Sequence, residues 1–168
     1  MSSLTVFDLL VLHPFLSGMP GARLQQVAAY GRPVVWPPGY RVFREDAPAV
    51  NLWLLTAGEV SLDFHVPGRG EVVVGRVGGG GLLGLSWIRP PYRWSVGAVT
   101  TAQCHAVELE ARGLRNLMAE DCATGTDLAQ RFLRVLAERL DAARRGLIPL
   151  GAAPDGVAGT LSRAVGDE

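Results

Sequence analysis

The spacing of apolar residues changes twice along this chain, and these changes predict the order of its elements. Residues 4–12 have the apolar content of a short helix that ends near Pro14. In residues 21–31, apolar side chains recur at helical spacing, and Gly31 is a suitable stop for this second helix. The pattern therefore places two helices at the beginning of the chain.

The middle of the chain has the pattern of a β protein. From Pro33 to Leu109, short runs of β-branched and aromatic residues alternate with glycine and proline. The pair Ala57-Gly58 predicts one hairpin turn, and residues 67–70 (PGRG) predict a second. This spacing indicates seven to eight strands, which is typical of a small sandwich or barrel.

Helical periodicity returns in the last third of the chain. Residues 111–121 form a short amphipathic pattern, and residues 124–146 predict the longest helix. Thr124 and Asp127 resemble a capping box at its start, and Gly146 is a plausible stop. Residues 1–147 are therefore expected to form one domain, and the Gly-, Ala- and Pro-rich residues 148–168 a mostly flexible tail.

The longest helix carries an apolar stripe wider than packing on one barrel requires. Its apolar residues are Leu128, Phe132, Leu133, Val135, Leu136, Leu140 and Ala143. A wide stripe favours a second partner. We therefore expect a homodimer through residues 124–147, with Phe132, Leu136 and Leu140 in the interface.

Composition excludes several classes of protein. The chain has 168 residues, 48% hydrophobic and 19% charged, with a formal net charge of +0, so it folds and has no global field for nucleic acid or anionic membranes. Cys104 and Cys122 lack the spacing of a zinc site. No stretch reaches the ~18 apolar residues of a membrane span. Because Asp8 interrupts the apolar N-terminus and no positive segment precedes it, export is rejected and a cytoplasmic location is expected.

Several short motifs occur in the order and spacing of a known family. They are His13-Pro14-Phe15, residues 38–48 (PGYRVFREDAP) and residues 52–60 (LWLLTAGEV). Over roughly residues 10–147 the chain resembles the cyclic nucleotide-binding domain of the catabolite-activator and fumarate-nitrate regulator group. The resemblance implies an α+β fold, a β-roll or jelly-roll barrel flanked by N-terminal helices and a long C-terminal helix. It also implies a regulatory, ligand-sensing role and parallel pairing of the long helices in a dimer.

Residues 78–98 (GGGGLLGLSWIRPPYRWSVGA) align with the phosphate-binding cassette of that family. Leu85 stands where the family has a glutamate that accepts a hydrogen bond from the ribose 2′-hydroxyl. Tyr92 falls on the position of the arginine that pairs with the cyclic phosphate. Arg93 follows one residue late, and on a strand it would face the opposite way.

The resemblance names a set of candidate ligand-binding residues, although the two polar partners are displaced or lost. The set is Gly81, Leu83, Gly84, Leu85, Tyr92, Arg93 and Ser95. The expected ligand is a cyclic nucleotide or another small phosphate, with weak or absent binding of cyclic AMP and cyclic GMP, and no further cofactor is expected.

Other interpretations of this segment stay open. The glycine run is also compatible with a flexible loop that needs positive φ, and the apolar lining with a small ligand of different chemistry. Residues 87–94 (WIRPPYRW) have the composition of a protein-protein hot spot, in which Trp87 and Trp94 would contact a partner. The chain would then be a scaffold or complex subunit with a vestigial pocket.

Catalysis and DNA binding are not expected. The sequence has no nucleophile motif, no Walker loop and no H-x-H pair followed by a glutamate, so no catalytic or metal-binding residues are assigned. Only about twenty residues follow the long helix, too few for a helix-turn-helix module, so nucleic acid is not an expected partner.

Overall fold

The computed structural model describes residues 4–151, with side chains up to residue 146. By its internal contacts the chain forms two compact units, Met1–Arg131 and Phe132–Glu168. Of the tail that the sequence predicts to be flexible, residues 152–168 lie outside the described residues. None of the helices in the described part combines the length and apolar character that crossing a bilayer requires.

The N-terminal helices agree with the sequence pattern except at the C-terminal end of the second one. Thr5 caps the first helix in a capping box: its Oγ1 accepts from the Asp8 amide at 3.2 Å, and the Asp8 carboxylate accepts from the Thr5 amide at 2.8 Å. Gly31 does not stop the second helix, as the sequence suggested, but begins a strand. A side chain there would meet Val6 at 2.8 Å, so packing keeps this position small. The helices are α1 (Val6–Leu12), the 3₁₀ helix η1 (Pro14–Leu16) and α2 (Gly21–Ala28).

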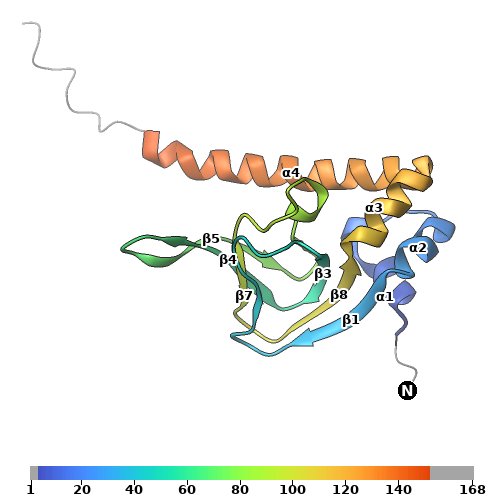
Figure 1. The fold of residues 1–168 in the computed structure, drawn as a ribbon, viewed down its shortest axis with the longest axis horizontal. Coiled ribbons are helices and arrows are strands. Elements are labelled where there is room, and N and C mark those ends of the chain that lie inside the picture. Colours follow the sequence, from blue (N-terminus) through green and yellow to red (C-terminus); the bar gives the residue numbers. More distant parts are fainter. Residues whose placement is uncertain (1–3, 152–168) are drawn as a thin grey trace, which may run out of the picture. The chain divides into compact units, whose positions relative to one another are not determined.

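Eight strands in the described residues form two antiparallel sheets, in the orders β1-β8-β3-β6 and β2-β7-β4-β5 (Figure 1). This is the β-roll that the sequence predicts. The strands are β1 (Gly31–Trp36), β2 (Arg41–Phe43), β3 (Asn51–Ala57), β4 (Glu59–Val66), β5 (Gly70–Gly78), β6 (Leu82–Leu83), β7 (Gly97–Thr100) and β8 (Cys104–Glu110).

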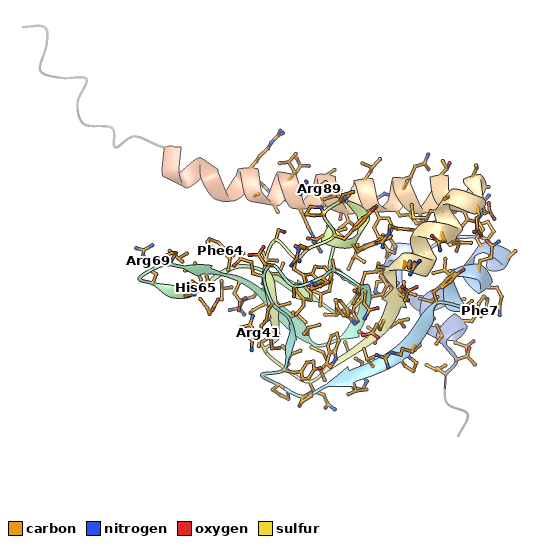
Figure 2. The ribbon with its side chains drawn as sticks, in the orientation of Figure 1. Phe7, Arg41, Phe64, His65, Arg69 and Arg89 are labelled. Carbon is orange, nitrogen blue, oxygen red and sulfur yellow. The ribbon has the colours of Figure 1, made fainter. Side chains whose placement is uncertain are left out.

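One of the two expected hairpins is absent. At Ala57-Gly58 the chain does not fold back on the same sheet, because β3 and β4 belong to different sheets. Gly58, at φ 92°, forms a corner between the sheets and packs directly on the backbone of Gln103 and Cys104. The turn at residues 67–70 does join β4 and β5 in a hairpin, with Arg69 near its tip (Figure 2).

Five aromatic side chains contact one another in and beside the core between the two sheets, and this group is called here the aromatic stack. Phe43, from one sheet, is stacked on Trp94 at 4.0 Å and on Trp53, from the other sheet, at 5.6 Å between ring centroids. The Trp53 indole N–H is satisfied by the Glu108 carboxylate at 2.8 Å. The members of the stack are Trp36, Tyr40, Phe43, Trp53 and Trp94.

The C-terminal helices are α3 (Ala111–Glu120) and α4 (Cys122–Gly151). Two expectations about α4 are wrong. The cap at its start is Asp121, whose Oδ1 accepts from the amides of Ala123 at 3.1 Å and Thr124 at 3.0 Å, and not a capping box of Thr124 and Asp127. Nor does the helix end at Gly146, where nothing lies within 4 Å of a built Cβ. The glycine has helical backbone there, and the helix continues to Gly151.

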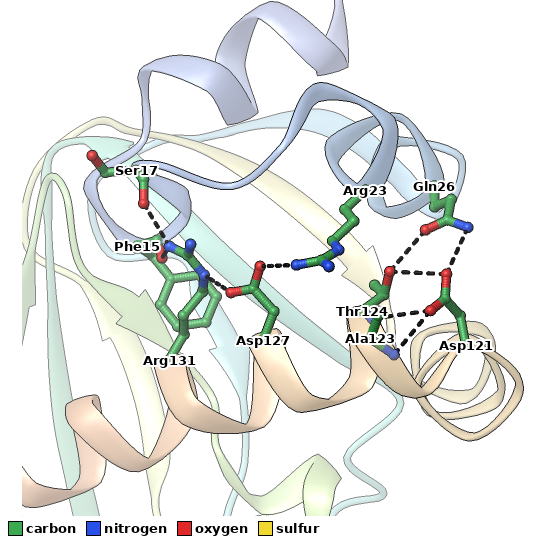
Figure 3. A network of polar contacts seen from close by, with 9 residues as sticks. All are labelled: Phe15, Ser17, Arg23, Gln26, Asp121, Ala123, Thr124, Asp127 and Arg131. Atoms are coloured by element: carbon green, nitrogen blue, oxygen red, sulfur yellow. Dashed lines mark hydrogen bonds and ion pairs between the residues drawn. The ribbon is translucent and has the colours of Figure 1, made fainter.

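Asp127 instead fixes the first turns of α4 to the N-terminal helices (Figure 3). Its carboxylate accepts from Arg23 of α2 at 3.0 Å and from Arg131 at 2.7 Å, and Arg131 also donates to the carbonyls of Phe15 and Ser17. Burial raises the pKa of Asp127, but the hydrogen bonds and charges of the two arginines outweigh it and hold this pKa below its ordinary value. Nearby, the Gln26 side chain donates to the Asp121 carboxylate and accepts from the Thr124 hydroxyl.

His13 connects the N-terminal helices to the roll. Its Nε2 lies 2.9 Å from the carbonyl of Leu55, and its Nδ1 accepts from the Phe15 amide at 3.2 Å. This pair of partners requires the neutral ring protonated on Nε2. Burial lowers the pKa of His13, and the hydrogen bond to Leu55 offsets only part of that effect.

Stability is therefore expected to decrease as the pH falls below about 6.5, where the unfolded chain takes up a proton that folded His13 does not. Chemical denaturation at pH values of about 7.5 and 5.5 measures this slope. His13→Gln keeps a donor for Leu55 without the titration, so the variant should lose part of the pH dependence. An identical slope in the variant and the wild type would contradict this role of His13.

Candidate functional site

The four-glycine run is a backbone turn and not an open anion cradle. Between β5 and β6, the amides of Gly79, Gly80 and Gly81 donate to the carbonyls of Gly58, Leu55 and Gly78 at 3.0, 2.7 and 3.0 Å. A side chain at Gly81 would come within 2.7 Å of Val77. The run is therefore glycine because the chain turns closely against itself, and these three amides are already used.

A cavity borders this turn and is lined by two of its glycines and by residues of the N-terminal helices and β3. It has a volume of about 410 Å³, and its apolar side chains come from α1, η1 and β3. Both ring nitrogens of His13, which also lines it, have partners within the chain. Its lining residues are Leu9, Leu12, His13, Pro14, Leu55, Thr56, Gly79 and Gly80.

Residues 81–95, called here the cassette, begin on β6 and return toward β7. Leu83 is fully buried in the roll, and Gly84 has φ 84°. Leu85 is half-buried and precedes the 3₁₀ helix η2 (Ser86–Ile88). The start of η2 lies close to the end of the cassette, because the hydroxyls of Ser86 and Ser95 are 3.4 Å apart.

Two arginines, Arg115 of α3 and Arg93 of the cassette itself, connect the outer part of the cassette to neighbouring segments. Tyr92, at φ 55°, lies under the guanidinium of Arg115 at 4.1 Å, and Arg115 also donates to the carbonyl of Trp87 at 2.6 Å. Arg93 is exposed and donates to the backbone carbonyl of Asp46. Its guanidinium therefore lies on the outside of the roll, as its displacement by one residue predicts. No sequence motif pointed to Arg115, which lies on α3, beyond the end of the aligned segment.

Trp94, near the C-terminal end of the cassette, is the residue that turns inward. It is 3% exposed, and its ring lies against Gly84, where a built Cβ would be only 2.8 Å from its Cη2 atom. Trp87 is fully buried as well. Neither indole can contact a protein partner in this conformation, so the proposed interface would have to use the residues between them, 88–93, which are exposed or half-buried. The inward direction of Trp94 could have been inferred from the sequence. Residues an even number of positions apart on a strand face the same side, and Ala98, four positions later, is buried.

Of the three residues expected at a dimer interface on α4, two are exposed and one is buried. Leu136 and Leu140 are 43% and 52% exposed, whereas Phe132 is buried. Leu133 is more exposed still, at 63%. Phe132 is therefore an unsuitable interface residue, and the dimer itself stays a prediction.

Three features of the cassette bear on a cyclic nucleotide as its ligand. Leu85 supplies no acceptor for a ribose hydroxyl, the Arg93 guanidinium is engaged outside the roll, and an indole lies on the cassette glycine. Among the described side chains, no group of three or more histidines, cysteines, aspartates and glutamates is placed to hold a metal ion. Cys104 is buried, and burial raises the pKa of its thiol, so it is not an activated nucleophile.

Known structures share this fold. A candidate cyclic nucleotide-binding protein from Geobacter metallireducens GS-15 is 25% identical with a TM-score of 0.72, covering 82% of this chain and 99% of its own. A cyclic nucleotide-binding domain from Methylobacillus flagellatus KT is 18% identical with a TM-score of 0.74, covering 89% and 84%. The catabolite activator protein of Thermus thermophilus is 22% identical with a TM-score of 0.65, covering 82% and 62%. No curated protein sequence matches the chain significantly.

The family of cyclic nucleotide-binding domains matches residues 33–121, which are 89 of the 168 residues and include most of the roll, the whole cassette and α3. The match, the two-sheet roll and the long C-terminal helix agree with one another. This chain belongs to the cyclic nucleotide-binding domain family.

Proposed function

We propose that this chain is a non-enzymatic regulatory module that binds cyclic AMP and cyclic GMP weakly or not at all. One observation carries the proposal: the cassette presents neither of the two polar partners that the family resemblance calls for. Leu85 replaces the residue that would accept a hydrogen bond from the ribose. The Arg93 guanidinium donates to the backbone carbonyl of Asp46 on the outer surface. A signal from such a module would come from another ligand or from a protein contact.

The expected loss of affinity follows from these two positions. A buried ribose hydroxyl without an acceptor costs ~1–3 kcal/mol, and a phosphate without its guanidinium loses a charge-assisted bond of similar or larger size. Together they move a micromolar ligand to dissociation constants weaker than about 100 μM.

A thermal-shift screen of cyclic mononucleotides, cyclic dinucleotides and other small phosphates tests the proposal. A ligand at a hundred times its dissociation constant stabilises the fold by about 2.7 kcal/mol, which is a shift that the screen detects. At about 1 mM we expect no such shift with cyclic AMP or cyclic GMP. A large shift with either one would oppose the proposal, and a shift with another phosphate would identify the ligand of the module.

The proposed module is a homodimer through the second unit. Leu133, Leu136 and Leu140 are exposed and spaced by three and four residues, and Ala143 continues the series. This is the spacing of the a and d positions of a coiled coil. In this seam Leu133 takes the place of Phe132, and Leu136 and Leu140 stay in it.

Leu136→Glu is expected to convert the dimer to a monomer, because it places an unpaired charge in an apolar seam. Light scattering should give twice 17.9 kDa for the wild type and 17.9 kDa for the variant. Ala142→Glu, which adds the same charge at an exposed position off the seam, should stay dimeric. A wild-type chain that is monomeric at micromolar concentration would rule out the dimer.

A further inference from the structure

Trp94 is buried at the point where the cassette meets the roll. Its indole is stacked on Phe43 with 4.0 Å between ring centroids and is tilted against Trp53 at 5.8 Å. Its Cη2 and Cζ3 atoms lie against Gly84 of the cassette. One side chain of the protein therefore bridges the cassette and the aromatic stack.

The contact with Gly84 leaves no space for another atom. A Cβ built on Gly84 would lie 2.8 and 2.9 Å from two carbons of the Trp94 ring and 3.7 Å from Trp53. Real Cβ atoms essentially never approach a neighbour this closely. A ligand that approaches the cassette glycine from inside the roll would need the same volume as the indole.

The backbone on both sides of the indole is fixed. Trp94 donates to the carbonyl of Ala47 at 3.0 Å and accepts from the amide of Asp46 at 2.9 Å, and the Tyr92 carbonyl accepts from the Ala49 amide at 2.7 Å. Opening of this pairing with residues 46–49 would release the backbone segment that carries the indole. The exposed side chain of Arg93 adds a further hydrogen bond between the two segments, to the Asp46 carbonyl.

We infer that Trp94 is the specificity-determining residue of this module, and that its indole takes the place of a ligand. It excludes cyclic nucleotides and holds the cassette closed on the roll without one. The site that remains when the indole is removed accepts a flat, apolar ring of indole size. This inference rests on the proposed function. It attributes the weak binding of cyclic nucleotides to the space that the indole fills, in addition to the missing polar partners.

Removal and replacement of the indole tests this inference on the full chain. Trypsin cleavage after Arg93 requires the 46–49 pairing to open, so it reports opening of the cassette. In Trp94→Gly we expect cleavage after Arg93 about tenfold faster than in the wild type, and millimolar indole should reverse most of that increase. Wild-type cleavage should be slow with or without indole.

Trp36→Gly is the matched control, because Trp36 is also a buried member of the stack but its ring contacts Tyr40 and Trp53. Indole should not protect Arg93 in this variant. If Trp94→Gly does not fold, Trp94→Leu provides a smaller cavity for the same measurement. Cleavage at Arg93 that indole does not slow in the Trp94 variant would overturn the inference and leave the proposed function intact.

A second variant separates the two claims. Leu85→Glu combined with Trp94→Arg removes the indole and offers an acceptor and a guanidinium on the inner side. We expect this variant to bind cyclic AMP at least about tenfold more tightly than the wild type. Equal weak binding by both would count against Trp94 as the determinant, whereas low-micromolar binding by the wild type would overturn the proposed function itself.

Discussion

Phe43→Ala is expected to lower the free energy of unfolding by about 3–5 kcal/mol, the range for removal of a buried phenyl ring. Phe43 is 7% exposed and its ring is stacked on both Trp94 and Trp53, so its removal leaves a cavity in the aromatic stack. Urea denaturation of the variant and the wild type measures the difference.

Tyr40→Ala is the matched comparison for that result. Tyr40 also belongs to the stack, but it is 45% exposed, and Trp36 is its stacking partner at 5.9 Å. Its removal should cost less than half as much as the removal of Phe43. Equal losses in the two variants would show that the stack does not form the core of the roll.

Gly58→Ala is expected to destabilise the protein by about 2–5 kcal/mol, from the combined cost of a positive φ and of overpacking. At φ 92°, a Cβ on Gly58 would lie 2.4 Å from the Gln103 carbonyl oxygen and 2.8 Å from the Cys104 Cα. Both contacts are with backbone, which cannot move aside as a flexible side chain can.

Gly68→Ala separates the two parts of this cost. Gly68 has φ 79°, and nothing lies within 4 Å of a Cβ built there, so only the backbone strain of ~1 kcal/mol applies. Denaturation of both variants under one set of conditions gives the comparison. If Gly58→Ala costs no more than Gly68→Ala, the corner between the sheets is not as closely packed as described.

The corner at Gly58 also shows how far the fold could be predicted from the sequence. Turn chemistry correctly places breaks at Gly58 and at residues 67–70, and the strand count, helix order and family resemblance predict the roll. A turn signal does not say whether the next strand joins the same sheet or the other one. Only long-range pairing distinguishes them, which is why the first turn was assigned wrongly and the second correctly.

The cassette could be predicted in part for a similar reason. The alternation of a strand correctly predicts that Arg93 faces away from the interior, and the same alternation assigns Trp94 to the inside. An aromatic residue beside arginine and two prolines has the composition of an interface, so composition favoured the surface. The amide partners of Gly79, Gly80 and Gly81 come from residues as far away as Leu55, and no local pattern predicts them.

Calorimetric titration of cyclic AMP into the full-length wild-type chain tests most directly whether this family member has lost cyclic nucleotide binding. Leu85, the outward Arg93 and the buried Trp94 predict a dissociation constant weaker than about 100 μM, or no measurable heat. Low-micromolar binding would contradict the account, because the cassette would then have to open and re-form around the nucleotide.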